Sequence, residues 1–173
     1  MVLQSLLLAL SSFGHDDTIA FAHAWGSLQV GGISTVGSLY DDYPLSPRLG
    51  ATLRFSHWNA VRSRLDLAYT RFSGTVPLHF LFGAAGFDWS LPRIPLELGA
   101  SLGLFYVRSF PDSIPHLNDD GETEFGASVR VTVPLWNREP WSLYAFAQYD
   151  RAWTLPHATV LPGLGLGLEH RLW

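Results

Sequence analysis

The stretch Leu-Glu-Leu-Gly-Ala-Ser-Leu-Gly-Leu-Phe-Tyr-Val at residues 96–107 decides the fold class of this chain. Successive side chains of a β-strand point to opposite faces, so strict alternation predicts a strand with one apolar and one polar face. The apolar face carries Leu96, Leu98, Ala100, Leu102, Leu104 and Tyr106. The other face carries Glu97, Gly99, Ser101, Gly103 and Phe105.

A period of two residues recurs along the chain from residue 25 onward. The candidate strands are residues 25–38, 48–57, 62–72, 78–90, 96–107, 124–135, 141–152 and 162–172. Segment 78–90 changes phase near Gly83-Ala84-Ala85-Gly86, which predicts a β-bulge or a small-residue contact there. Eight candidate strands in 173 residues, one domain's worth of chain, predict an all-β fold.

The connections between these segments alternate in kind. Tight turns are predicted at 59–61, 92–95 and 137–140, and the tryptophans that precede them are Trp58, Trp89 and Trp136. The longer and more acidic connections are 39–47, 73–77, 109–122 and 154–158. Short turns at one end and longer loops at the other are typical of outer-membrane barrels.

Composition excludes several classes of site and partner. The chain lacks cysteine, which rules out a disulfide framework and a thiolate metal site, and its net charge of −4 argues against nucleic acid as a partner. All eleven basic residues are arginine, whose planar side chain pairs tightly with carboxylates. The sequence contains no Walker loop, dinucleotide fingerprint or His-Glu-x-x-His motif, so no cofactor is expected.

The N-terminal segment has a different character from the rest of the chain. Leu6-Leu7-Leu8-Ala9-Leu10 forms a short apolar core, and Ala22-His23-Ala24 offers small residues for cleavage. This pattern resembles a secretory signal peptide, although an ordered N-terminal segment is the alternative. We therefore expect residues 1–24 to be one of these two and residues 25–173 to form the barrel.

The polar face of the strands favours a membrane barrel over a soluble one. A soluble barrel would turn this face outward and fill it with long charged side chains, but here it is mostly Gly, Ser and Thr. Small residues suit the crowded lumen of a barrel of about eight strands. The few charges on this face should pair inside the lumen, since a buried charge without a partner is costly. They are Arg54, Arg64, Asp66, Glu97, Glu124, Arg130, Asp150, Glu169 and Arg171. The sequence predicts a closed antiparallel up-and-down transmembrane β-barrel.

The terminal segment Gly163-Leu164-Gly165-Leu166-Gly167-Leu168-Glu169-His170-Arg171-Leu172-Trp173, with the eight strands and Trp-rich ends, resembles small bacterial outer-membrane barrels of the OmpA and OmpX class. In that class the barrel-assembly machinery recognises a C-terminal aromatic residue that follows alternating apolar residues. Trp173 supplies the aromatic residue, but the leucines are in phase with Leu172. The resemblance implies residence in the bacterial outer membrane, with lipid, the assembly machinery and other envelope proteins as partners.

Two further sets of residues are candidate sites. His157-Ala158-Thr159 is similar to the His-x-Ser pattern of outer-membrane lipid A deacylases, with Thr159 in place of Ser. An acidic loop could bind a divalent cation through oxygen and imidazole ligands, although its spacing matches no calcium-loop motif. The residues of this loop are Asp112, His116, Asp119, Asp120 and Glu122.

The sequence favours a non-enzymatic outer-membrane barrel that anchors in the bilayer, supports its loops or contributes to an envelope complex. Two alternatives stay open. One is a lipid A-modifying enzyme with a Ser/Thr-His site at the loop-end rim. The other is a narrow channel along the charged lumen, although eight strands leave little space inside.

Overall fold

The computed structural model of the chain describes residues 23–36, 45–58, 60–74, 77–109, 121–153 and 159–173. These residues form eight strands: β1 (Ala24–Ile33), β2 (Ser46–Trp58), β3 (Val61–Phe72), β4 (Leu78–Ser90), β5 (Glu97–Ser109), β6 (Glu122–Arg138), β7 (Trp141–Ala152) and β8 (Thr159–Arg171). Within the described ranges, no helix has both the length and the apolar character needed to span a bilayer.

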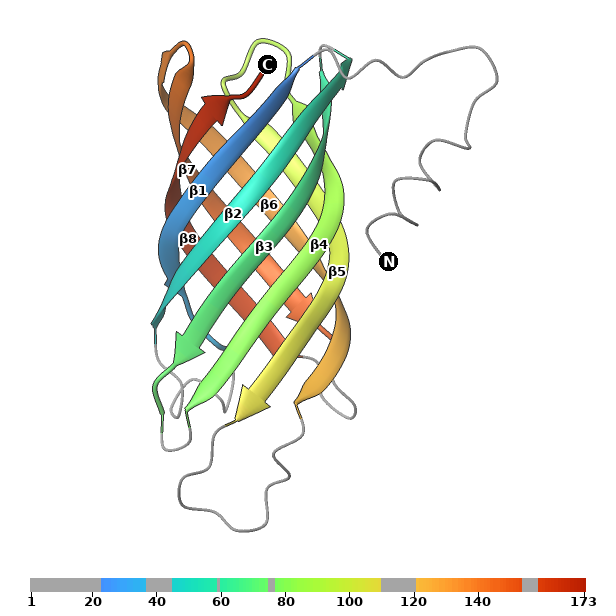
Figure 1. The fold of residues 1–173 in the computed structure, drawn as a ribbon, viewed down its shortest axis with the longest axis vertical. Helices are drawn as coiled ribbons and strands as arrows, with labels where there is room; N and C mark the ends of the chain where they lie inside the picture. The colour runs from blue at the N-terminus through green and yellow to red at the C-terminus, as the bar shows by residue number, and fades with distance from the viewer. Residues whose placement is uncertain (1–22, 37–44, 59, 75–76, 110–120, 154–158) are drawn as a thin grey trace, which may run out of the picture.

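The strands close into one barrel in the order of the chain (Figure 1). Each strand is antiparallel to its neighbours, and β1 closes against β8 with Leu28 opposite Leu168. Closure pairs the backbone N–H and C=O groups of the last strand edges, which lipid could not satisfy. The predicted closed antiparallel up-and-down barrel is confirmed.

The two ends of the barrel differ in their connections. Short connections join β2 to β3, β4 to β5 and β6 to β7 at one end, which we call the turn end. The other end, at the bottom of Figure 1, carries the two longest connections, from β1 to β2 and from β5 to β6, and is called the loop end. Trp89, Trp136 and Trp141 are exposed at the turn end. Because Trp prefers the headgroup region of a bilayer, these residues mark one membrane boundary.

The leucines of β5 decide between a soluble and a membrane barrel. Leu98, Leu102 and Leu104 face outward with 42%, 57% and 53% of their surface exposed. Ser101 and Phe105, at the alternating positions, are buried in the interior. A soluble barrel would hide its leucines inside, whereas leucines on the outside of a closed barrel are typical of a membrane-spanning one. The outer face of this barrel is therefore suited to hydrocarbon.

β4 keeps a single phase through residues 83–86, so of the two predicted alternatives the bulge is wrong. Small residues do meet there, since a Cβ added at Gly103 of β5 would lie 2.6 Å from Cβ of Ala84. The strand pairs residue by residue with β3 and β5. The sequence pattern suggests a change of phase because apolar and polar residues share the inward face: Phe80 and Phe82 lie on the same face as Asp88. Along the described strands, register shifts occur near the turn end, between Ser56 and Trp58 and between Pro134 and Trp136.

From residue 163 onward, β8 supplies glycines to the interior and leucines to the exterior. Gly165 lies opposite Phe146, and Gly167 lies opposite Tyr144. A methyl group added at Gly165 would come within 2.5 Å of the Phe146 ring, so the glycine makes room for the aromatic side chain. Trp173 follows the end of β8 and is exposed at the turn end.

Candidate functional site

Charged side chains fill the lumen from the turn end to its middle. They occupy inward positions of the strands, because a period of two places every second residue inside. Five arginines and five carboxylates among the described residues contact one another, and we call this set the charge network. Its members are Arg48, Arg54, Arg62, Arg64, Asp66, Asp88, Glu97, Arg130, Asp150 and Glu169.

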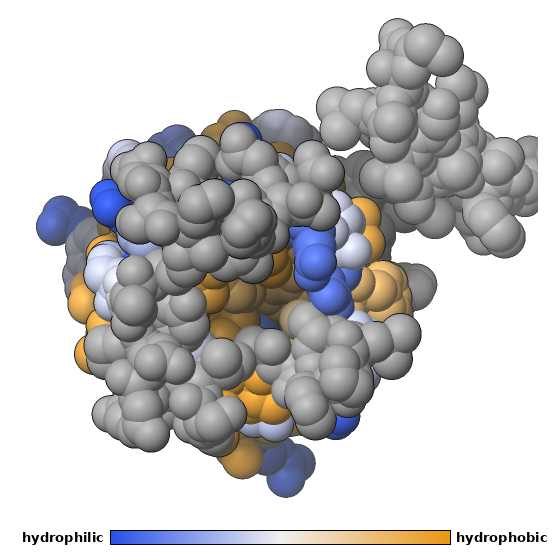
Figure 2. All heavy atoms as spheres, turned by 90° about the horizontal axis from the view of Figure 1, so that it is seen from below, coloured by the Kyte–Doolittle hydropathy of each residue, from blue (hydrophilic) through white to orange (hydrophobic). Residues whose placement is uncertain are grey.

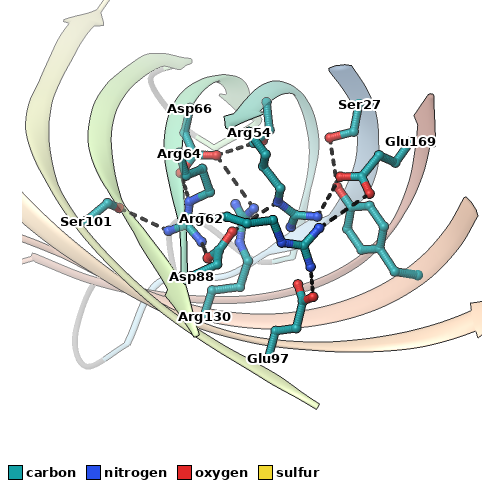
Figure 3. Close-up of polar contacts among 12 residues, drawn as sticks. Ser27, Arg54, Arg62, Arg64, Asp66, Asp88, Glu97, Ser101, Arg130 and Glu169 are labelled. Carbon is teal, nitrogen blue, oxygen red and sulfur yellow. Dashed lines mark hydrogen bonds and ion pairs between the residues drawn. The ribbon is translucent and has the colours of Figure 1, made fainter. Parts of the chain in front are cut away.

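Asp88 lies at the centre of the charge network, between two arginines (Figure 3). Its Oδ2 atom lies 3.0 Å from Nε of Arg54, and its Oδ1 atom accepts a hydrogen bond from Nη1 of Arg64. Nε of Arg64 also lies 2.6 Å from Oδ2 of Asp66. All four side chains are buried. Removing one member of such a buried pair leaves an uncompensated charge and typically costs about 3–5 kcal/mol.

Asp66 connects this centre to β1, β2 and β6. Nη1 of Arg130 lies 3.6 Å from Oδ1 of Asp66, and the hydroxyl of Thr52 donates to the same oxygen at 2.7 Å. The amide of Gln29 donates to the Thr52 hydroxyl at 2.7 Å and to the Tyr144 hydroxyl at 2.9 Å. Side chains of β1, β2, β6 and β7 therefore fix the position of the Asp66 carboxylate, which belongs to β3.

Arg130 also connects the network toward the loop end. Its Nη2 atom donates to the Gln148 carbonyl at 3.1 Å, and the Gln148 amide donates to Asp150 at 2.7 Å. The same Asp150 oxygen lies 2.5 Å from Nη1 of Arg48. The Arg48 guanidinium lies 5.6 Å from the centre of the Phe82 ring, where polar filling gives way to apolar filling.

Glu169 connects the network to the turn end. Its two oxygens lie 2.7 Å from Nη1 of Arg54 and 4.0 Å from Nη1 of Arg62. Arg62 forms an ion pair with Glu97. A cavity of about 320 Å³ at the turn end is lined by these side chains and by residues that include Trp25. Arg62 and Glu97 are more exposed than the rest of the network, so solvent screens their pairing more strongly.

Apolar side chains fill the lumen on the loop-end side of the network. The rings of Phe82 and Phe105 stack with their centres 4.4 Å apart, and Phe72 meets Phe80 edge-on at 5.1 Å. Figure 2, seen from the loop end, shows hydrophobic side chains at the centre of the barrel. We call the buried members the apolar cluster; they are Ile33, Ala68, Phe72, Phe82, Phe105, Ala152 and Leu161.

The predicted lumen charges fall into two groups. Those that lie in the network are Arg54, Arg64, Asp66, Glu97, Arg130, Asp150 and Glu169. The other two lie nearer the ends of the barrel. Arg171 lies at the turn end, 33% exposed, with Nη1 3.3 Å from the Glu139 carboxylate. Glu124 is half-buried near the loop end, opposite Phe105 in the register.

Sequence reasoning missed Arg48, Arg62 and Asp88. Arg48 and Arg62 have the same phase as Arg54 and Arg64 on their own strands, so counting in steps of two from either predicted arginine finds them. Asp88 was hidden by the assumed change of phase in β4. These three of the ten network residues could therefore have been predicted by continuing one alternating pattern along the whole of each strand.

The other candidate sites lie at the edge of what the structure describes. His157, Asp112, His116, Asp119 and Asp120 fall outside the described residues, and only the backbone of Thr159 is described. Glu122 is exposed at the start of β6. Among the described residues, no group of three or more His, Cys, Asp or Glu side chains could hold a metal ion. The hydrolase and metal hypotheses therefore stay predictions.

Solved structures with a similar fold are small barrels from bacterial outer membranes. Neisserial surface protein A matches with 16% identity and a TM-score of 0.61 over 85% of this chain and 96% of that one. Ail of Yersinia pestis, solved with the heparin analogue sucrose octasulfate, matches with 13% identity and a TM-score of 0.62 over 87% and 98%. The N-terminal barrel domain of OprF from Pseudomonas aeruginosa matches with 16% identity and a TM-score of 0.54 over 84% and 96%.

The chain has the fold of a small outer-membrane β-barrel. This result confirms the resemblance drawn from the sequence. No protein-family model and no curated protein sequence matches the chain. Since the identities to the solved barrels are low and folds host many functions, the role of this barrel has to be argued from its own residues.

Proposed function

We propose that this chain is a non-enzymatic β-barrel of the bacterial outer membrane with a structural role. Its apolar outer face anchors it in lipid, its longer connections face the outside, and either end is available to another envelope protein. The filling of its lumen is the observation that carries this proposal. The charge network occupies the lumen toward the turn end, and the apolar cluster occupies it toward the loop end. In both regions the inward side chains pack against one another.

A closed lumen distinguishes this role from that of a channel. Ion conduction needs a continuous polar path, and binding along that path must be weak enough for ions to leave. Here Phe72 and Phe105 are fully buried on the loop-end side, and Arg54, Arg64 and Asp88 are held by ion pairs. The buried rings and the ion pairs both support a barrel whose lumen is filled by its own side chains and is closed to ions.

Planar-bilayer recordings test this proposal. We expect the purified barrel, folded in detergent and added to a bilayer, to give the same current as a bilayer without protein. A porin reconstituted in the same way provides the positive control. Stable conductance steps that change in size in Arg130→Ala would instead establish a channel, because Arg130 lies in the middle of the lumen between Asp66 and Gln148.

Mass analysis of lipid A from cells tests the enzymatic alternative. We expect lipid A of unchanged mass in cells with and without the protein. A mass shift that depends on the protein and disappears in His157→Ala or Thr159→Ala would replace the structural proposal by an enzymatic one. The heat-dependent gel mobility of each variant provides the control for correct folding.

A further inference from the structure

The cavity at the turn end is a partly enclosed pocket in the mouth of the barrel, and we call it the turn-end pocket. Its volume of about 320 Å³ lies at the low end of the range of ligand pockets, roughly 300–1,000 Å³, which suits a small molecule. Three of its charged lining residues are positive and three are negative, so together they carry no net charge. They are Arg54, Arg62, Arg171, Glu97, Glu139 and Glu169.

The arginines of the turn-end pocket gather around Trp25 of β1. In the strand register Trp25 lies opposite Arg54 of β2 on one side and Arg171 of β8 on the other. The guanidinium of Arg62, on β3, lies 5.3 Å from the centre of the Trp25 ring. Side chains that are paired across neighbouring strands lie on the same face of a sheet. The wall of the pocket that runs from β8 through β1 to β3 is therefore basic.

Two carboxylates of the turn-end pocket lie on the opposite wall. Glu97 is on β5, and Glu139 belongs to the turn between β6 and β7. β5 is four strands from β1 in the closed barrel, so it lies across the lumen from Trp25. Glu169 is on the basic wall, but its Oε2 atom lies 2.7 Å from Nη1 of Arg54, which balances its charge. The pocket thus has a basic wall and an acidic wall.

The ion pairs between these two walls are accessible to solvent. Nη1 of Arg171 lies 3.3 Å from the Glu139 carboxylate, and Nη2 of Arg171 lies 2.8 Å from Nδ1 of His23. Arg62 pairs with Glu97, and both side chains are partly exposed (Figure 3). Because solvent-accessible ion pairs contribute little to stability, a ligand with charges of both signs can replace one partner of each pair at small cost.

From this arrangement we infer that the turn-end pocket binds a short zwitterionic peptide of dipeptide size, with its carboxylate on Arg171 and its ammonium group on Glu139. The guanidinium of arginine binds a carboxylate through paired N–H donors, and a glutamate carboxylate accepts hydrogen bonds from an ammonium group. A ligand with a single charge would match one wall and leave the charge of the other wall without a partner. The site is independent of the structural role proposed above and of whether the barrel conducts.

Isothermal titration calorimetry of the detergent-folded barrel with alanyl-alanine tests this inference. Two analogues each lack one charge: N-acetyl-alanyl-alanine lacks the ammonium group, and alanyl-alanine amide lacks the carboxylate. Because hydrogen bonds between charged groups are stronger than neutral ones, we expect each analogue to bind about 10-fold more weakly than alanyl-alanine. The absence of alanyl-alanine binding, or equal binding of either analogue, would overturn the assignment to a zwitterion.

Substitutions in the pocket assign each ligand charge to its partner. Arg171→Gln should weaken the binding of alanyl-alanine about 10-fold but leave that of the amide unchanged, since the amide has no carboxylate for Arg171 to bind. Glu139→Gln should weaken the binding of alanyl-alanine to a similar extent and leave that of the acetylated analogue unchanged. A variant that weakens all three ligands equally would contradict the assigned orientation.

Arg138 provides a matched control for Arg171. It is an exposed arginine at the turn end, at the last position of β6, and it lies outside the lining of the pocket. We expect Arg138→Gln to bind alanyl-alanine within about 2-fold of the native chain, because solvent screens a charge that does not contact the ligand. Heat-dependent gel mobility verifies the folding of each variant. Equal losses in Arg138→Gln and Arg171→Gln would overturn the site, as would unchanged binding in Arg171→Gln.

Discussion

The turn-end and loop-end halves of the lumen fill the same kind of space by opposite means. Toward the turn end, Arg54, Arg64 and Asp88 are buried and each charge lies against a charge of opposite sign. Toward the loop end, Phe82 and Phe105 fill the lumen with stacked rings. The polar half is stable only while its charges stay matched, whereas the apolar half depends on the volume and shape of its side chains.

This difference predicts how each half responds to substitution. A neutralised charge in the polar half leaves its partners desolvated and unmatched, so its effect extends to several residues at once. A truncated ring in the apolar half leaves a cavity, and its effect depends on how far the neighbours can relax. The boundary between the halves lies where the Arg48 guanidinium meets the Phe82 ring.

Asp88→Asn should give the largest loss of stability. It removes one negative charge from between Arg54 and Arg64 and leaves both guanidinium groups buried. We expect the free energy of unfolding to fall by about 4 kcal/mol, as is typical when one partner of a buried ion pair is lost. Urea-dependent folding into phospholipid vesicles, followed by tryptophan fluorescence and gel mobility, measures this change.

Glu139→Gln is the control for Asp88→Asn. It removes the same charge from a carboxylate that is 78% exposed and pairs only with Arg171 among the described residues. Exposed ion pairs contribute little, so we expect a loss below about 1 kcal/mol. Similar losses in the two variants would show that the charge network is solvated, which contradicts its role as the filling of the lumen.

Phe105→Ala should give a somewhat smaller loss in the apolar half. It removes a fully buried ring that stacks on Phe82, and we expect a loss of about 3 kcal/mol, at the low end for a buried Phe. Phe125→Ala is the matched control, because Phe125 stacks on Trp153 on the outer face and is half exposed. The same folding assay should give a loss near 1 kcal/mol for that variant, roughly a third as large. A greater loss for Phe125→Ala would place the stabilising contacts outside the lumen.

The fold was predictable from the sequence because alternation in strands such as β5 fixes which side chains face out. The phase of Arg54 and Arg64 likewise placed charges inside without knowledge of their partners. The pairing itself was not predictable, since Arg54 contacts Glu169, 115 residues away, through the closure of β1 on β8. The apolar cluster was missed for a related reason. A Phe on an inward position of β4 has the same sequence signal as a Phe that faces lipid.

The smallest net effect is expected where the two halves meet, in the double variant Arg48→Met/Asp150→Leu. Replacing a buried ion pair by apolar side chains of similar volume is often neutral, and Phe82 already offers Arg48 an apolar neighbour. We expect the double variant to lie within about 1 kcal/mol of the native chain, because the loss of the Gln148–Asp150 hydrogen bond is the main remaining cost.

The corresponding single variants make this last comparison informative. Arg48→Met alone leaves the Asp150 carboxylate buried without its ion-pair partner, and we expect a loss of about 3 kcal/mol. The double variant should recover most of that loss, which a double-mutant cycle measures directly as the coupling between the two positions. A double variant as unstable as the sum of the two single variants would show that Asp150 is needed for more than its pairing with Arg48. In that case the apolar half of the lumen could not be extended toward the turn end by replacing this one ion pair with apolar side chains.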